Sequence, residues 1–360
     1  MRVPRLFHDA LVARPVFVAP DRAGRPGDFG DAPLGLGGPA RCPFCAGNES
    51  LTPPEVLRAP PAAPGLPGGG PWRSRIVPNR FPFVHDAAES ELAGESRGGL
   101  APAEDGPGCA PGRPALGVHD VVVESPHHIA SITAIDPPGW REAWLLCRER
   151  LAMLAADTSI AWATVFKNSG AAAGASLVHV HSQIVGLAIV PPVIQAELAA
   201  ASLPHAAADP FTALIDEAAA AGRIVAESAA GLVALVPPAP RQPFETWILP
   251  REPVAFFSEA AGAHVESLAD LTQSYIGRLE SLVPGASYNW WLHQPPFPSP
   301  RPRAGTAASG PSDRPRYRWH LEIVPRINGL AGFELGTGCH VSTHLPEDCA
   351  TQLRGAGSRR

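Results

Sequence analysis

Two histidines separated by one residue follow a stretch of small residues near the middle of the chain. Residues 168–176 read Asn-Ser-Gly-Ala-Ala-Ala-Gly-Ala-Ser, and His179-Val-His181-Ser-Gln183 comes shortly after. Alternate side chains of a strand share one face, so His179, His181 and Gln183 are predicted to point the same way. The small residues would let backbone N–H groups approach a phosphate closely. The pattern favours a functional site over paired surface histidines or a chance metal site.

A second group with chemical potential lies near the N-terminus. Cys42 and Cys45 form a Cys-x-x-Cys pair, which is typical of a zinc half-site or of a redox pair. A redox pair usually begins a helix after a strand, and the Gly/Pro-rich surroundings argue against that placement. A zinc half-site needs two further ligands from elsewhere. Arg22 and Arg25 lie in a preceding loop, where their guanidinium groups would suit a phosphate or simply face water.

Composition excludes several classes of protein. The 360 residues suffice for two domains or one large one, and the net charge of −5 without a long basic run argues against nucleic acid as a partner. No apolar run of about 18 residues occurs, so we expect no membrane partner. The N-terminus lacks the apolar core of a signal peptide, and we expect a cytoplasmic location. Six cysteines are too few for a disulfide scaffold.

The elements that must position these residues recur in two halves of the chain. Each half has a strand that ends in proline, a long helix, a further strand, and then a strand with a His-x-(His/Glu) pair. The pattern therefore predicts a duplicated α+β unit. In the second half, Glu322 occupies the position that His181 occupies in the first half. Only the first half therefore has two histidines in this pair. The segments in the first half are 121–126, 140–156, 161–168 and 179–181, and those in the second are 244–250, 257–282, 288–293 and 320–322.

Several short motifs together resemble the galactose-1-phosphate uridylyltransferase family, a branch of the histidine-triad superfamily. The central His179-Val-His181-Ser-Gln183 resembles that family's active-site stretch, although the family usually has Pro and Gly where Val180 and Ser182 stand. The similarity runs in order from residue 21 to residue 350. The other motifs are Cys42-Pro-Phe-Cys45, Thr52-Pro-Pro-Glu55, Ile76-Val-Pro-Asn79-Arg-Phe81, Ser125-Pro-His-His128, Pro243-Phe-Glu-Thr246 and Gly332-Phe-Glu334.

The resemblance implies an α+β fold of two tandem histidine-triad-like units, each an antiparallel sheet with helices packed on it. We expect an N-terminal catalytic unit with a zinc knuckle at 1–190, a C-terminal unit at 191–350 and a tail at 351–360. A homodimer is expected from the resemblance alone.

The resemblance also implies a ping-pong reaction that moves a UMP group between hexose 1-phosphates. His181 would attack the α-phosphorus of a UDP-sugar, and a hexose 1-phosphate would then attack the nucleotidyl-histidine. Gln183 would donate to a phosphoryl oxygen, and Ser176 with Gly174 would hold the β-phosphate. The further substrate-binding residues implied are Arg22, Arg25, Asn79, Phe81, Asn168, Phe333 and Glu334.

By the same resemblance Cys42, Cys45, His128 and His179 would hold a structural zinc ion, with His127 as an alternative ligand. A second metal is expected near His293, His320 and Glu322, where the family has a histidine in place of Glu322. Two other functions stay open. One is a nucleoside-diphosphate-sugar or dinucleoside-polyphosphate phosphorylase, or an adenylyltransferase, that uses the same histidine. The other is a zinc-stabilised nucleotide-binding protein without turnover.

Overall fold

The computed structural model describes residues 3–9, 14–21, 38–62, 70–86, 112–202, 209–298 and 316–357. In this part of the chain a ten-stranded sheet runs through the molecule, and every neighbouring pair in it is antiparallel. The strands in spatial order are β3 (Leu57–Ala59), β4 (Ser74–Pro78), β6 (Gly117–Val123), β8 (His181–Leu187), β7 (Trp162–Ser169), β12 (Tyr288–His293), β13 (His320–Pro325), β11 (Thr246–Pro250), β10 (Leu232–Leu235) and β9 (Ile224–Glu227).

The order of the strands repeats in reverse on the two sides of the β7–β12 pair. Each half contributes five strands. In each half the strand that comes last in the sequence, β8 or β13, lies second from this junction. The α+β class with antiparallel sheets and packed helices is confirmed. The two halves share one continuous sheet, because β7 and β12 pair directly from Phe166 with Trp291 to Ser169 with Tyr288. The boundaries at 190 and 350 stay predictions.

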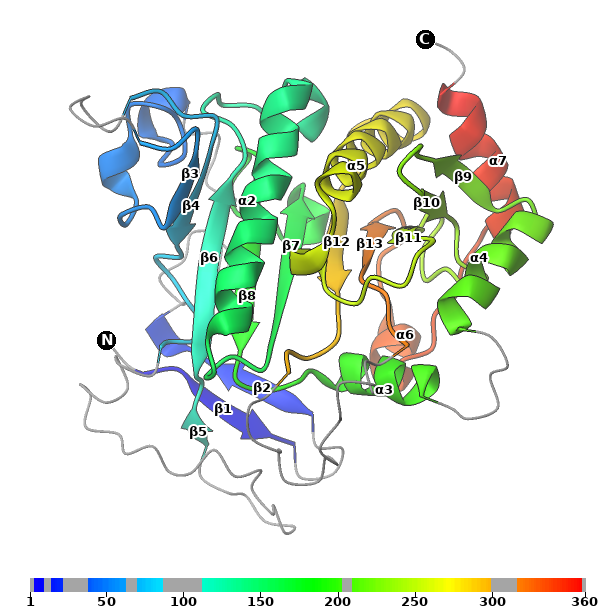
Figure 1. Ribbon diagram of the computed structural model, residues 1–360, viewed down its shortest axis with the longest axis horizontal. Helices are drawn as coiled ribbons and strands as arrows, with labels where there is room; N and C mark the ends of the chain where they lie inside the picture. The colour runs from blue at the N-terminus through cyan, green and yellow to red at the C-terminus, as the bar shows by residue number, and fades with distance from the viewer. Residues whose placement is uncertain are drawn as a thin grey trace.

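Two long helices cover one face of this sheet, as Figure 1 shows. α2 (Pro137–Ala156) packs on β3, β4 and β7, α5 (Gly262–Leu282) packs on β10 and β11, and the helices contact each other. Asp136 begins α2, since its carboxylate accepts from the backbone N–H of Gly139 and Pro137 follows it. Trp140 and Trp144, four residues apart on one helix face, pack against Trp290 of β12.

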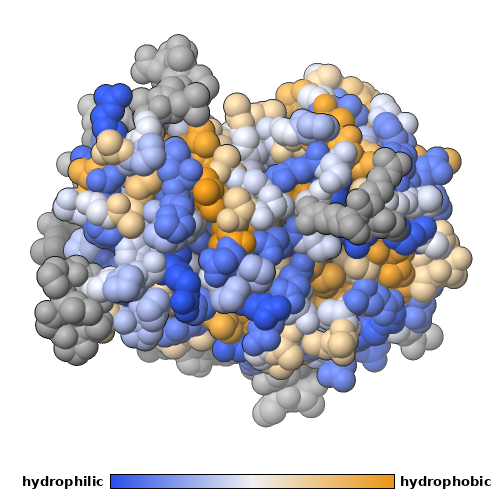
Figure 2. Space-filling model, turned by 90° about the horizontal axis from the view of Figure 1, so that it is seen from above, coloured by the Kyte–Doolittle hydropathy of each residue, from blue (hydrophilic) through white to orange (hydrophobic). Residues whose placement is uncertain are grey.

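Smaller elements complete the fold. A three-stranded sheet contains β1 (Arg5–His8), β2 (Pro15–Val18) and β5 (Arg113–Pro114). The remaining α-helices among the described residues are α3 (Pro192–Ala201), α4 (Pro210–Ala220), α6 (Gly332–Thr337) and α7 (Pro346–Gly357). None of the described helices is long and apolar enough to cross a membrane. The face seen in Figure 2 mixes hydrophilic residues with smaller apolar patches.

Three expectations from the sequence need correction. Residues 351–357 are not a tail but the end of α7, because Cys349 and Leu353 are buried where this helix packs on α5. The helix expected at 257–282 begins at Gly262, after a separate 3₁₀ turn at Phe257–Glu259. The catalytic strand begins at His181, so His179 precedes it in a loop instead of sharing it.

Candidate functional site

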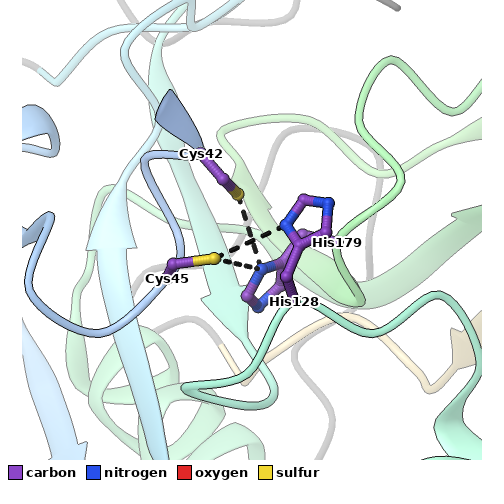
Figure 3. Close-up of side chains that lie close together, drawn as sticks. All are labelled: Cys42, Cys45, His128 and His179. Atoms are coloured by element: carbon purple, nitrogen blue, oxygen red, sulfur yellow. Dashed lines mark hydrogen bonds between the residues drawn. The ribbon is translucent and has the colours of Figure 1, made fainter. Parts of the chain in front are cut away.

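Four predicted metal ligands converge from three separate loops. Cys42 and Cys45 lie between the 3₁₀ turns at Pro39–Arg41 and Glu49–Leu51, His128 follows β6, and His179 precedes β8. Figure 3 shows both sulfur atoms facing the two imidazoles. The cysteine loop is fixed to the end of β6 because the backbone N–H of Ala46 donates to Pro126 O at 2.9 Å. We call Cys42, Cys45, His128 and His179 the Cys₂His₂ cluster.

The separations in the Cys₂His₂ cluster suit one tetrahedral ion. Nδ1 of His179 lies 3.5 Å from Sγ of Cys42 and 3.6 Å from Sγ of Cys45, and Nδ1 of His128 lies 3.5 Å from the latter. Zinc at about 2.3 Å from sulfur and about 2.0 Å from nitrogen separates the two ligand atoms by about 3.5 Å in a tetrahedron. The four donor atoms all lie within 4.8 Å of one another, so the cluster could hold a metal. It contains His128 and not His127.

Protonation in the cluster also fits a cation. Nε2 of His179 donates to the carbonyl oxygen of Ser125 at 2.8 Å, which leaves the lone pair on Nδ1, the atom that faces the sulfurs. Burial lowers the pKa of His179 to about 4, so its ring is neutral near pH 7. Burial, together with the neighbouring Cys42, raises the pKa of Cys45 to about 11. Two adjacent thiolates here therefore need a positive ion beside them.

The ring of His181 is held in one tautomer by the backbone of His179, two residues earlier in the chain. Its Nδ1–H donates to the carbonyl oxygen of His179 at 2.8 Å, so Nε2 carries the lone pair. The ring of Phe44, from the cysteine loop, lies 5.3 Å from the His181 ring between centroids. The Cys₂His₂ cluster thus fixes His179, and His179 in turn fixes the reactive nitrogen of His181.

Gln183 follows on the same face of β8, and its amide is held by a histidine that the sequence analysis did not single out. Nε2 of His119, on β6, lies 2.8 Å from Oε1 of Gln183 and 3.0 Å from Nδ2 of Asn79. Oδ1 of Asn79 accepts from the backbone N–H of Phe81 at 2.9 Å, so Nδ2 must face His119. Because Nδ2 of Asn79 is a donor, Nε2 of His119 either accepts from Asn79 or donates to Oε1 of Gln183, according to its tautomer, and does not do both. In the tautomer with a proton on Nε2, His119 donates to Oε1, and the amide N–H groups of Gln183 are left for another acceptor.

The remaining predicted residues lie in or beside the loop between β7 and β8. Gly174 and Ser176 belong to the loop, and Asn168 lies near the end of β7. Asn289 of β12 donates to Oδ1 of Asn168 at 2.8 Å and to the carbonyl oxygen of Ala173 at 2.9 Å, which ties the loop to the sheet. Gly170 and Gly174 have φ of 83° and 79°, values that favour glycine. Gly174 is exposed and Ser176 is half-buried, so the loop can receive a ligand from solvent.

Some predicted substrate-binding residues are not brought to this site. Arg22 and Arg25 lie outside the described residues. Phe333 and Glu334 lie on α6, which Figure 1 places in the other half of the molecule from β8. Phe333 is 57% exposed, and Glu334 accepts from the backbone N–H of Ala331. Within one chain, these two side chains do not reach His181.

A second cluster adds Glu197 of α3, which the sequence analysis missed, to the three residues expected near a second metal. We call Glu197, His293, His320 and Glu322 the Glu197 cluster, and their ligand atoms lie within 4.8 Å of one another. Oε1 of Glu197 accepts from Nδ1 of His293 at 2.8 Å. Oε2 of Glu322 accepts from Arg241 at 2.5 Å and from Trp291 Nε1 at 2.9 Å. Either a divalent cation or Arg241 can balance these carboxylates.

Known proteins resemble this chain over almost its whole length. The family model described as galactose-1-phosphate uridyl transferase, N-terminal domain, matches residues 109–191. An ADP-glucose phosphorylase of Arabidopsis thaliana is 30% identical over 357 residues, which cover 98% of this chain and 92% of that protein. A crystal structure of an ADP-glucose phosphorylase from Arabidopsis thaliana with bound ADP-glucose has a TM-score of 0.70, 30% identity and 98% coverage of both chains. A uridylyltransferase structure has a TM-score of 0.73 at 24% identity, covers 99% of both chains and is alike in fold.

Proposed function

The chain belongs to the galactose-1-phosphate uridylyltransferase family and is an enzyme of that family. We propose that it transfers a nucleotidyl group from a sugar nucleotide, and that the reaction passes through a covalent intermediate on His181. One observation carries the proposal. The Nδ1–H of His181 donates to the carbonyl oxygen of His179, so the nitrogen that can attack phosphorus is defined in advance.

In the first step, Nε2 of His181 attacks the α-phosphorus and forms a P–N bond. The bond between that phosphorus and the bridging oxygen breaks, and the sugar 1-phosphate leaves with its electron pair. Nδ1–H stays bonded to the His179 carbonyl, which stabilises the positive charge that develops on the ring. In the second step, an acceptor phosphate oxygen attacks the same phosphorus, and the P–N bond breaks.

Two further groups act on the phosphoryl oxygens in this proposal. Gln183 donates its amide N–H to an oxygen on which charge develops, while His119 holds the other end of the amide. The loop at residues 170–176 holds the β-phosphate with Ser176, while the backbone N–H groups of Ala173, Gly174 and Ala175 donate within the loop and fix its shape. Asn79, Phe81 and Asn168 line the nucleotide pocket.

We propose zinc for the Cys₂His₂ cluster because two thiols and two imidazoles form a closed tetrahedral donor set. When bound, the ion supplies rigidity and no Lewis-acid chemistry, since all four positions belong to protein atoms. Its contribution to transfer is to hold His179, whose carbonyl orients His181. The Glu197 cluster is proposed as a second and weaker metal site, because Glu322 is already paired with Arg241.

Two reactions remain as candidates, and they differ in the nucleotidyl group and in the acceptor. The relative that is 30% identical over 98% of the chain is an ADP-glucose phosphorylase, which favours an adenylyl group and inorganic phosphate. The family model named for a uridyl transferase favours a UMP group and galactose 1-phosphate. We propose phosphorolysis of ADP-glucose first, because that similarity spans both halves of the chain.

The two candidates separate in one assay. Purified protein is incubated with ADP-glucose or UDP-glucose, and with inorganic phosphate or galactose 1-phosphate as acceptor, and glucose 1-phosphate release is measured in all four combinations. Phosphate-dependent release from ADP-glucose supports the phosphorylase. Release only with UDP-glucose and galactose 1-phosphate refutes it in favour of uridylyl transfer, and no release in any combination refutes both.

We also propose a homodimer. Exposed apolar side chains occur in the segment after β13. Phe333 and Glu334 lie far from His181 of their own chain, so they could contact a sugar phosphate only at the active site of a second copy. Light scattering after gel filtration tests this, and a monomer at micromolar concentration would refute it. The exposed apolar residues are Phe333, Leu335, Val341 and Leu345.

A further inference from the structure

Lys167 is the only lysine in a chain with 29 lysine and arginine residues. It lies on β7 and is 2% exposed. A buried ammonium loses its hydration, and arginine is the more common partner in buried ion pairs. A compact ammonium at this position, where the remainder of the chain uses arginine, therefore needs a specific explanation.

The ammonium of Lys167 connects two buried partners, one just after β6 and one at the start of β8. Nζ donates to Oε2 of Glu124 at 2.5 Å and to the main-chain carbonyl oxygen of His181 at 2.8 Å. The other oxygen of Glu124 accepts from the hydroxyl of Ser182, the residue after His181. Glu124 is 1% exposed and Ser182 is 3% exposed. Lys167, Glu124 and Ser182 thus hold both the backbone of His181 and its neighbour.

On the side of β7, strand pairing does not extend to the backbone of His181. Pairing between β7 and β8 ends at Phe166 with Gln183, whereas β7 continues to pair with β12 as far as Ser169 with Tyr288. The strands β7 and β8 therefore separate at the end of β8 where His181 lies. The side chain of Lys167 spans this opening and bonds the carbonyl oxygen of His181 in place of a strand partner.

The contact lies on the face of the sheet away from the reacting nitrogen. Glu124 and Ser182 line a small space together with Trp140, Trp144 and Cys147 of α2. His181 points to the opposite face, where its ring meets Phe44. Lys167 therefore acts on the backbone under the nucleophile and does not reach the substrate.

We propose that Lys167, paired with Glu124 and Ser182, is a positioning residue that keeps His181 in the orientation from which Nε2 attacks the α-phosphorus. The inference rests on the proposed nucleotidyl transfer. It assigns a catalytic requirement to a buried ion pair that would otherwise serve stability alone.

The test removes the ion pair without leaving an unpaired buried charge. Lys167→Met alone would strand the Glu124 carboxylate, so the informative variant is Lys167→Met with Glu124→Gln, in which the amide oxygen can still accept from Ser182. The matched control is Arg150→Met with Asp120→Asn, because that ion pair (2.8 Å) is likewise largely buried and joins α2 to β6 instead of joining β7 to the start of β8.

Two readouts are compared between these variants. The first is the single-turnover rate at which radiolabelled ADP-glucose or UDP-glucose labels the protein, beside the Kd of the nucleotide sugar. The second is the ring tautomer of His181 in the free protein, from long-range ¹H–¹⁵N spectra assigned against His181→Asn. We expect the Lys167/Glu124 variant to label about 100-fold more slowly with a Kd within about twofold of the parent, since a shift of about 1 Å costs that much. Its His181 ring should lose the pure Nδ1–H form.

The control pair should keep both readouts. A Lys167/Glu124 variant that retains the parent's tautomer and labelling rate overturns the proposal. If the parent protein takes up no label from either nucleotide sugar, the proposed function fails instead, and the tautomer comparison alone decides whether Lys167 positions His181.

Discussion

Replacing Cys45 by serine removes a donor that contacts two imidazoles of the Cys₂His₂ cluster, at 3.5 Å from His128 and 3.6 Å from His179. A hydroxyl is a much weaker zinc ligand than a thiolate, so the variant should lose the ion. His179 then keeps only the bond from its Nε2 to Ser125, and the carbonyl that orients His181 is less firmly held.

The magnitude follows from linkage between binding and folding. An ion present at 100 times its Kd stabilises the folded state by about 2.7 kcal/mol. For a chain of 360 residues, with an unfolding entropy of about 2.1 cal/mol/K per residue, that corresponds to a fall in Tm of about 4 °C. We expect Cys45→Ser to lose this amount, and a chelator to take the same amount from the parent protein and nothing from the variant.

The assay combines metal content by mass spectrometry with thermal unfolding, with and without chelator. Cys339→Ser is the control, because Cys339 is exposed and far along the chain from the cluster. The reasoning is refuted if Cys45→Ser keeps one equivalent of zinc, or if the parent contains zinc but the chelator leaves its Tm unchanged.

Three further predictions test separate parts of the account. His119→Phe should slow nucleotidyl transfer by about 10- to 100-fold, since Gln183 loses the partner of its amide oxygen, and should also raise the Kd for the nucleotide sugar, since Asn79 loses its contact with the same ring; an unchanged single-turnover rate would exclude the role in orienting Gln183. Gly170→Ala should cost about 2–3 kcal/mol in denaturant unfolding, because φ is +83° and a Cβ would lie 2.2 Å from Ser287 Oγ, whereas Gly174→Ala, with φ +79° and open space, should cost about 1 kcal/mol; equal losses would contradict the packing argument. In chelator-treated protein, Glu322→Gln should cost most stability between about pH 4.5 and 6.5 and less near pH 9, and a cost that does not vary with pH would contradict the charge argument.

The pH prediction rests on the direction of two shifts. Burial alone would raise the pKa of Glu322, but the contact with His320, whose Nε2 lies 3.5 Å from Oε1, and the charges of His293 and Arg241 lower it well below its usual range. Its contribution to stability is therefore full above the unfolded pKa of about 4.3 and is lost as the pH falls. Burial would lower the pKa of His320, but Glu322 raises it. That contribution is full below about pH 6.5 and is lost as the pH rises through the folded pKa.

The sequence allowed much of the fold and part of the site to be predicted. Regular apolar patterns located α2 and most strands of the sheet. The family resemblance implied Cys42, Cys45, His128 and His179 as one set of metal ligands, and the structure brings their ligand atoms within 4.8 Å of one another. Spacing alone marked Cys42 and Cys45 as a half-site and His179 as one of a His-x-His pair, whereas His128 came from the resemblance. The sequence did not predict that α7 reaches residue 357, because an alanine- and glycine-rich segment has few apolar residues to mark a buried face.

The partners of the catalytic residues were missed for a different reason. His119 meets Gln183, and Glu124 meets Ser182, only because β6 and β8 pair in one register, with Val121 opposite Gln183. A single sequence does not fix that register between strands some 60 residues apart. Glu197 likewise approaches His293 from α3, 96 residues earlier in the chain. The one available signal was Lys167, the sole lysine, which composition alone did not distinguish from a bias toward arginine.

The measurement that tests the central claim most directly is the isolation of the covalent intermediate. Protein is mixed with nucleotide-labelled ADP-glucose or UDP-glucose without acceptor, quenched, digested and mapped by mass spectrometry, beside His181→Asn. The account predicts an acid-labile nucleotidyl group on the peptide that contains residue 181, discharged by phosphate or a hexose 1-phosphate and absent from the variant. Turnover by the parent with no such adduct, or an equal rate in His181→Asn, would contradict it.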